Sequence, residues 1–145
     1  MASVGIYLNF DGDTEAAFEF YREVFGGELT DFMRMGDMPA DPGRPELPAA
    51  ERSLVMHVEL TLPGGVQLMG TDVLPSMGHV LRPGNNLTIS LTPDTLDETR
   101  RLFDALSAGG SEVAELQQMF WGSYWGTCLD RFGTRWMFNF PVAQD

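Results

Sequence analysis

The pattern of apolar and polar positions repeats along the chain. An apolar run around Leu8 is followed by a polar turn, a stretch with helical apolar spacing and a glycine pair that begins at Gly26. The same order returns from Ile89 to a glycine pair that begins at Gly109. The spacing is 18 residues in the first case and 20 in the second. This repeat predicts two homologous modules folded against each other, with the groove between them as a natural ligand site.

Each glycine pair follows a stretch typical of an amphipathic helix. In the first stretch, apolar side chains recur as adjacent pairs every four residues (Ala16, Ala17, Phe20, Tyr21, Val24 and Phe25). Asp11, Asp13 and Thr14 offer N-cap oxygens, and Gly26 provides the left-handed stop. The second helix is predicted to open at Thr92, with Pro93 at its first helical position. Each helix therefore has one face to bury.

The segments that follow each helix have the patterns of strands. Residues 54–60 alternate, with His57 and Glu59 on the face opposite Met56 and Val58. Further strands are predicted at 66–69, 126–129 and 136–140, after turns at 63–65 and 130–133. Each module therefore reads β-α-β-β-β. Two helices and about eight strands, grouped in threes after each helix, predict an α+β layer architecture. A TIM barrel or a Rossmann fold is not expected, because strands and helices do not alternate regularly.

The domain organisation predicted from this pattern is a single domain over residues 1–145. Module one covers about 1–72, a linker covers 73–84, and module two covers about 85–142. Residues 36–52 contain four prolines and are predicted to form an inserted loop, a candidate lid.

Charge and cysteine content narrow the functional classes. The net charge is −12, from 21 acidic and nine basic residues, and all nine are arginine. Such an acidic chain is expected to avoid nucleic acid and anionic membranes. Without lysine, neither Schiff-base chemistry nor a P-loop lysine is available. Cys128 is the single cysteine, so no intrachain disulfide forms, and a cytoplasmic location is expected. In its strand, Cys128 is predicted to be a buried, inert thiol.

Several motifs resemble those of PhnB-like proteins in the vicinal oxygen chelate superfamily, which includes glyoxalase I, bleomycin resistance proteins and extradiol dioxygenases. The motifs cover nearly the whole chain, at residues 7–13, 20–29, 56–60, 67–72 and 125–136. The resemblance implies the α+β glyoxalase/bleomycin resistance fold, in which two βαβββ modules form curved mixed sheets around a cleft, usually within a homodimer.

Metal-dependent members of this superfamily hold a divalent ion with His, Glu or Gln side chains at four cleft positions. By alignment of the motifs, these positions fall at or near Ile6, Gln67, Asn86 and Met137. Only Gln67 is a plausible ligand, Asn86 is a weak one, and the other two do not suit a hard cation. We therefore expect no metal and no other cofactor, with Gln67 and Asn86 as ligand-binding residues.

Two further groups of side chains could carry function. His57 and Glu59 are candidate catalytic residues as a base and its orienter, or as a metal-ligand pair; the alternative is a hydrogen-bonded pair on the sheet surface. Four aromatic rings in residues 120–125 suggest a loop over the cleft mouth. In it, Trp121, Tyr124 and Trp125 would form a ligand wall; the alternative is structural packing or a dimer interface.

The sequence leaves three functional hypotheses. The first is a module that binds a small organic molecule in a metal-free cleft, with a role in sequestration. The second is a metal-dependent lyase, isomerase or dioxygenase that uses Gln67, His57 or Glu59 from a rearranged site, or a metal-free enzyme with His57 as general base. The third is an interaction protein whose cleft is filled.

Overall fold

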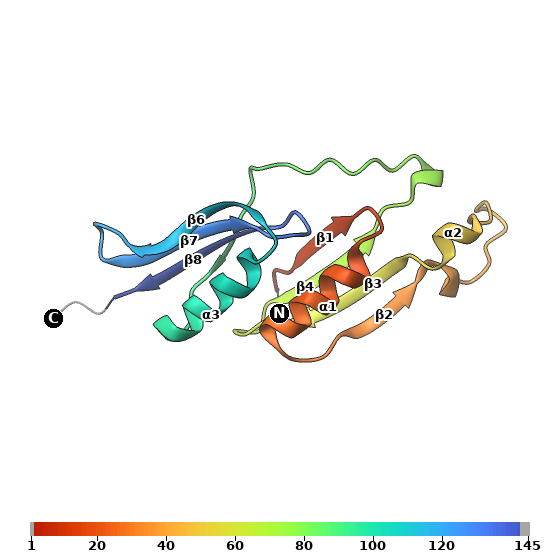
Figure 1. Cartoon of the computed structure of the whole chain (residues 1–145). Coiled ribbons are helices and arrows are strands. Elements are labelled where there is room, and N and C mark those ends of the chain that lie inside the picture. Colours follow the sequence, from red (N-terminus) through yellow and green to blue (C-terminus); the bar gives the residue numbers. More distant parts are fainter. Residues whose placement is uncertain (1, 143–145) are drawn as a thin grey trace. The chain divides into compact units, whose positions relative to one another are not determined.

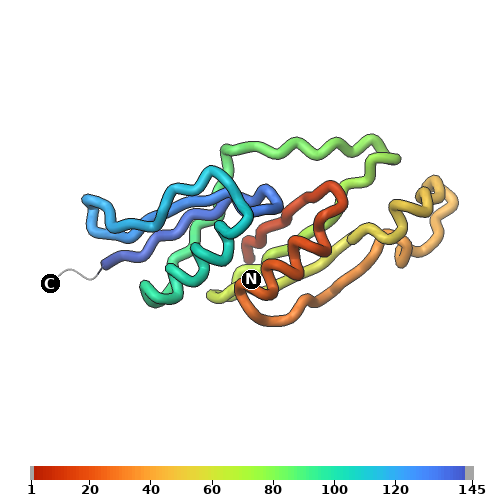
Figure 2. The backbone as a smooth tube through the Cα atoms, in the orientation of Figure 1, coloured from red at the N-terminus to blue at the C-terminus, as the bar shows by residue number. Residues whose placement is uncertain are grey.

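The computed structural model describes residues 2–142, and the chain divides into two compact units, Met1–Arg82 and Pro83–Asp145. We call them unit one and unit two. Each contains a four-stranded mixed sheet and one long α-helix, in the predicted order β-α-β-β-β (Figure 1). The backbone trace shows one clear difference between the units (Figure 2). Residues 35–54 form a long connection between two strands of unit one, whereas the corresponding connection in unit two is the short turn 119–122. The predicted α+β fold is confirmed.

Unit one carries eight of the described elements: β1 (Ile6–Phe10), α1 (Thr14–Phe25), β2 (Thr30–Arg34), η1 (Met35–Asp37), α2 (Ala49–Arg52), β3 (Val55–Thr61), β4 (Gln67–Asp72) and η2 (Pro75–Met77). Its strands lie in the order β1-β4-β3-β2, with β1 parallel to β4 and the other pairs antiparallel. Two short helices, η1 and α2, lie at the two ends of the proline-rich segment 36–52, which was predicted to be a loop throughout.

Unit two carries β5 (Ile89–Leu91), α3 (Leu96–Ser107), β6 (Ser111–Gln118), β7 (Ser123–Leu129) and β8 (Arg135–Pro141). The strand order β5-β8-β7-β6 repeats the topology of unit one, again with one parallel pair followed by antiparallel pairs. No helix in the described part of the chain is long and apolar enough to cross a membrane.

In unit one, α1 covers one face of the sheet by packing on β3 and β4. A Cβ atom at Gly70 would collide with Cε2 of Phe18, a fully buried side chain of α1. Gly70 therefore marks the helix-covered face, and its glycine allows the helix to approach β4 closely. Val58 is paired with Gly70 and is also fully buried, so the core lies between α1 and this face.

In unit two, α3 covers its sheet by packing on β6, β7 and β8. The Phe103 ring of α3 meets the Phe138 ring of β8 edge to face, with centroids 5.4 Å apart. Trp136 is fully buried on the same strand, two residues from Phe138. Strand alternation therefore places Trp136 and Phe138 in one core under α3.

A buried carboxylate caps the N-terminus of α1. Asp72 is only 3% exposed, and its Oδ1 accepts hydrogen bonds from the backbone N–H of Gly12 and Thr14 and from the Thr14 hydroxyl. Its Oδ2 accepts from the Val55 N–H at 2.9 Å. The sequence-based expectation of a local side-chain cap was wrong, because Asp13 occupies the N-cap position without a side-chain cap bond. The carboxylate at the end of β4 satisfies the helix start instead.

Asp130 has a corresponding role in the last turn of unit two. Its Oδ1 accepts from the N–H groups of Phe132 and Thr134, and its Oδ2 accepts from the Trp136 indole at 2.8 Å. The side chain is 3% exposed. The motif at residues 130–136 therefore fixes the β7–β8 turn and orients the largest side chain of the core.

The predicted start of the second helix was wrong. The helix begins at Leu96, and its N-cap is Thr95, whose Oγ1 accepts the Glu98 N–H at 3.1 Å. Pro93 lies before the helix rather than in its first turn. The segment Thr95 to Glu98 has the Thr-x-x-Glu spacing of a capping box. The Thr95 hydroxyl accepts the N–H of the third helical residue, which lies six residues from Thr92 and so out of reach of the Thr92 hydroxyl.

The aromatic segment 120–125 was predicted to be a loop, and this is only half correct. Residues 119–122 form the turn of the β6–β7 hairpin, whereas Ser123 begins β7 and the next two residues are paired with β8. Gly122, with φ of 93°, supplies the turn. After Gly122 the chain is a strand, because pairing with β8 outweighs the local preference of glycine and serine for a loop.

Candidate functional site

The sheet of unit one has a face that α1 does not cover, which we call the open face. Residues paired across β1, β4 and β3 alternate with those of the core, so Tyr7, Met69 and Glu59 form one row on this face. His57 lies two residues along β3 from Glu59, and Gln67 lies two residues along β4 from Met69. The strand register thus brings hydrogen-bonding and apolar side chains from three strands onto one surface.

Three of these side chains form a continuous hydrogen-bonded chain. His57 Nε2 lies 2.9 Å from Glu59 Oε1, and His57 Nδ1 lies 3.1 Å from the Tyr7 hydroxyl oxygen. The Tyr7 and His57 rings are tilted by 44°, with centroids 5.7 Å apart. The histidine and glutamate side chains are 24% and 23% exposed, whereas Tyr7 is 47% exposed. These hydrogen bonds therefore connect a partly sheltered carboxylate, through the imidazole, to a phenol exposed to solvent.

The four sequence-aligned cleft positions do not share one environment. Gln67 lies on the open face, where its amide oxygen accepts from the Thr61 hydroxyl at 3.2 Å. Ile6 is paired with the buried Leu68 and so points toward the helix-covered side of the same sheet. Asn86 is exposed in the coil before β5. Met137 lies on β8, on the face of the unit-two sheet opposite Phe138.

The donor set at these positions does not fit a divalent cation. Isoleucine has no donor atom, and the thioether of Met137 is a soft ligand. Across residues 2–142, no cluster of three or more His, Cys, Asp or Glu side chains could hold a metal ion. The best oxygen and nitrogen donors, Glu59 and His57, are hydrogen-bonded to each other, so a metal at Nε2 would have to displace the carboxylate.

The aromatic side chains of unit two divide between two faces of its sheet. Trp125 is paired with Asn139 on the face that α3 leaves uncovered. The ring centroids of Trp125 and Trp121 are 6.4 Å apart. Tyr124 points to the other side, where the Arg100 guanidinium of α3 lies 5.4 Å from its ring centroid. Trp121 is 46% exposed. The two tryptophans remain candidates for ligand stacking, whereas Tyr124 lies on the opposite face.

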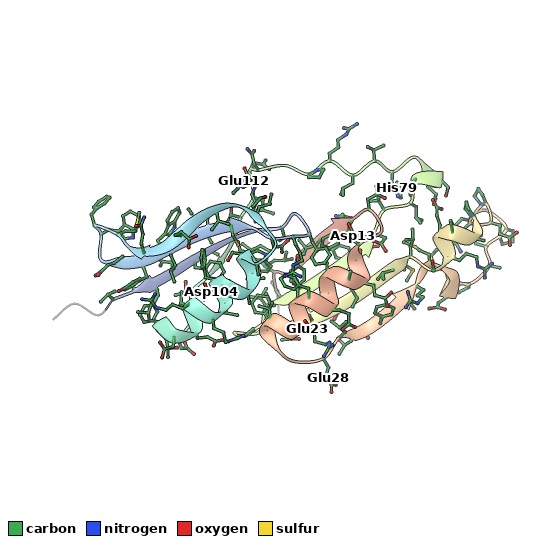
Figure 3. All side chains as sticks on the ribbon, viewed as in Figure 1. Asp13, Glu23, Glu28, His79, Asp104 and Glu112 are labelled. Carbon is green, nitrogen blue, oxygen red and sulfur yellow. The ribbon has the colours of Figure 1, made fainter. Side chains whose placement is uncertain are left out.

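Cys128 and His79, two other side chains with reactive groups, make structural contacts. Burial, with a smaller contribution from the Asp130 carboxylate, raises the pKa of the Cys128 thiol to about 11. The predicted burial of Cys128 is confirmed, and its lack of reactivity stays a prediction. His79, labelled in Figure 3, lies after η2, and its Nδ1 accepts the Leu74 N–H at 3.3 Å. It takes no part in the hydrogen-bonded chain of the open face.

The proline-rich segment 36–52 borders a hollow of its own. The hollow has a volume of about 590 Å³ and is lined by residues of the segment together with Met35. Arg44 ties the segment together by donating to the Pro39 carbonyl oxygen at 2.6 Å. None of the open-face residues lines this hollow, and the predicted role of the segment as a lid stays a prediction.

Tyr7 is a member of the candidate site that was not predicted from the sequence. Tyr7 and His57 are 50 residues apart in the chain, and β4 lies between their strands. The signal that could have found Tyr7 is the sheet order of a βαβββ module, which places the first strand beside the last. Strand alternation then puts every second residue of the first strand on the face that carries His57.

Comparison with known proteins agrees with this fold. Residues 4–138 match the model of the Glyoxalase/Bleomycin resistance protein/Dioxygenase superfamily. The chain is 30% identical over 143 residues to protein YjdN of Escherichia coli, and this alignment covers 95% of each chain.

Solved structures give the same result. Protein PA1353 of Pseudomonas aeruginosa superposes with a TM-score of 0.82 at 33% identity and covers 97% of this chain and 98% of its own. A PhnB protein from Bacillus cereus has a TM-score of 0.69 at 22% identity, with 96% and 99% covered. The second likeness concerns the fold alone.

Proposed function

The chain belongs to the Glyoxalase/Bleomycin resistance protein/Dioxygenase superfamily, and from this premise we propose that it binds a small organic molecule on the open face of unit one without a resident metal ion. The proposed role is capture or sequestration of that molecule. The observation that carries the proposal is the hydrogen-bonded chain of Tyr7, His57 and Glu59 on the sheet face of unit one opposite α1.

The composition of the open face suits a small, partly planar ligand. The exposed Tyr7 ring and the flexible thioether of Met69 offer apolar, polarisable contact area. His57, Glu59 and Gln67 add a few polar groups that would fix the ligand's orientation, as in most small-molecule sites. Because His57 and Glu59 hold each other, their positions are set before a ligand arrives, which lowers the entropic cost of binding.

The charge of the site favours a ligand with a cationic or hydrogen-donating group. Glu59 supplies a carboxylate only 23% exposed, and the whole chain carries a net charge of −12. A partly sheltered carboxylate attracts an amine or amidine more strongly than a fully solvated one, because solvent screens it less. Anionic ligands are correspondingly disfavoured.

The test is a binding screen with a matched pair of histidine variants. Wild-type protein is screened by saturation-transfer NMR against small planar amines and neutral heteroaromatic compounds. We expect saturable binders that are lost in His57→Ala and retained in His79→Ala, since the second variant removes a histidine outside the site. Binders unaffected by His57→Ala would contradict the placement, and a broad panel without any saturable binder would contradict the function.

The metal-dependent alternative is tested on the same protein. Wild-type protein is incubated with Ni, Zn, Mn or Fe(II), dialysed, and analysed for retained metal. The proposal expects no stoichiometric retention. One equivalent of metal per chain that disappears in His57→Ala would overturn the metal-free proposal and favour a lyase, isomerase or dioxygenase.

A further inference from the structure

We propose that Tyr7 is a chemically activated proton donor and acceptor of the open face, with His57 as its proton partner and Glu59 as the positioning residue. This goes beyond binding, because it gives the open face an activity: proton transfer with a bound ligand that carries an acidic O–H or C–H group. It rests on the proposed function only for the place where the ligand lies.

The hydrogen-bond partners fix which nitrogen of His57 carries a proton. An ionised carboxylate can only accept hydrogen bonds, so the 2.9 Å contact with Glu59 Oε1 requires a proton on Nε2. In the neutral imidazole, Nδ1 is then an acceptor. The Tyr7 hydroxyl lies 3.1 Å from Nδ1 and is the only donor in that contact. Glu59 therefore selects the tautomer that makes His57 a base for the phenol.

This arrangement has the same logic as a nucleophile, base and orienter in hydrolytic enzymes, with a phenol in the nucleophile's position. The carboxylate also stabilises the imidazolium that forms when His57 takes the phenolic proton. Tyr7 is the most exposed of the three residues, at 47%, while the other two are about half as exposed. The reactive end of the chain is thus the end that a ligand reaches.

The other two tyrosines of the chain have different surroundings. Tyr21 is fully buried in unit one, where its ring packs edge to face on Phe18. The Tyr124 ring in unit two lies against the Arg100 guanidinium of α3. Tyr124 therefore provides a reference phenol within the same chain.

The proton-transfer step balances without any further reactant. The Tyr7 O–H bond breaks, its proton moves to His57 Nδ1, and the electron pair stays on the phenolate oxygen. The phenolate then takes a proton from the acidic O–H or C–H of the ligand, and that bond's electron pair remains on the ligand anion. Tyr7 then gives a proton back to the ligand anion, at the same or another atom, while the Nδ1 proton of the imidazolium moves to the phenolate oxygen. This restores neutral Tyr7, neutral His57 and a neutral ligand, and no group is oxidised or reduced.

The experiment measures phenol reactivity directly, with benzenesulfonyl fluoride as the probe and no ligand present. The phenolic oxygen attacks sulfur, an S–O bond forms, the S–F bond breaks, fluoride leaves and the phenolic proton passes to His57. Rates are read by peptide mass spectrometry at neutral pH. We expect Tyr7 to react about 100-fold faster than Tyr124, within the range that a positioned base supplies. His57→Phe should remove about this whole factor, and His79→Phe should not change it.

The positioning role of Glu59 needs a readout that a merely structural residue would not move. In ¹⁵N-histidine-labelled wild-type protein, we expect His57 to be protonated at Nε2 and unprotonated at Nδ1. Glu59→Gln should mix the tautomers and slow Tyr7 labelling while the far-UV circular dichroism stays unchanged. A proton on Nδ1, or equal labelling of Tyr7 and Tyr124, would overturn the inference.

The two proposals fail separately. Because the labelling is done without a ligand, saturable binding with an unreactive Tyr7 would refute the inference and leave the binding function standing. A reactive Tyr7 without any binder in the screen would refute the binding function and leave the inference about Tyr7 standing. A His57→Phe variant that loses its circular dichroism signal is replaced by His57→Gln, which is expected to slow labelling in the same way.

Discussion

Replacing Asp72 with alanine removes the acceptor of four hydrogen bonds at the point where β4, β3 and the start of α1 meet. The donors are the N–H groups of Gly12, Thr14 and Val55 and the Thr14 hydroxyl. Asp72 is 3% exposed, so water cannot take its place without opening the structure. The variant therefore leaves buried donors unsatisfied and creates a cavity.

The size of the effect follows from the number of donors. A buried donor without a partner costs about 1–3 kcal/mol. Three of the four bonds are fully buried, so Asp72→Ala should lower the free energy of unfolding of unit one by at least about 3 kcal/mol. Asp72→Asn keeps one oxygen for the Gly12 and Thr14 donors and turns its amide toward Val55. Its expected cost is about 2 kcal/mol.

Urea unfolding followed by far-UV circular dichroism measures both variants. The control is Asp13→Ala, at the N-cap position but without a side-chain cap bond, and its expected change is within about 0.5 kcal/mol. The order of stability should be Asp13→Ala, then Asp72→Asn, then Asp72→Ala. A cost below about 1 kcal/mol for Asp72→Ala would refute the reasoning that this carboxylate holds the helix start.

Two further predictions concern unit two. Thr95→Ala removes the acceptor of the Glu98 N–H and should destabilise unit two by about 1 kcal/mol in urea unfolding, whereas Thr92→Ala should leave it nearly unchanged; equal effects would contradict Thr95 as the N-cap of α3. The pKa of the Cys128 thiol is raised to about 11 in the folded state from its ordinary value near 9.0, so folding favours the neutral thiol. This stabilisation is fully present below about pH 9 and is lost as pH rises toward about 11, by about 2 kcal/mol. The urea midpoint of wild-type protein should thus fall more steeply over this interval than that of Cys128→Ala, and parallel curves would argue against the shift.

The order of helices and strands could be predicted from the sequence because its signals are local. Apolar pairs every four residues define α1, and alternation defines β3, with His57 and Glu59 correctly placed on one face. The start of α3 was misplaced because two threonines three residues apart both fit an N-cap. Only Thr95 has glutamate three residues later, and that signal outweighs the proline.

The candidate site could be predicted only in part, because its contacts are not local. The His57–Glu59 pair follows from strand alternation alone. Its third member, Tyr7, depends on the placement of β1 beside β4, which no local pattern determines. The same holds for Asp72, whose donors lie up to 60 residues away and which local reasoning replaced by Asp13.

All three tryptophans of the chain, at positions 121, 125 and 136, lie in unit two, whereas the two tyrosines Tyr7 and Tyr21 are the phenols of unit one. Excitation near the red edge of indole absorption therefore observes unit two alone. Excitation at shorter wavelength adds tyrosine emission. This emission comes from the two tyrosines of unit one and from Tyr124, a single residue of unit two. The molecule thus carries separate optical reporters in its two halves, and one fluorimeter can determine whether they melt together or in sequence.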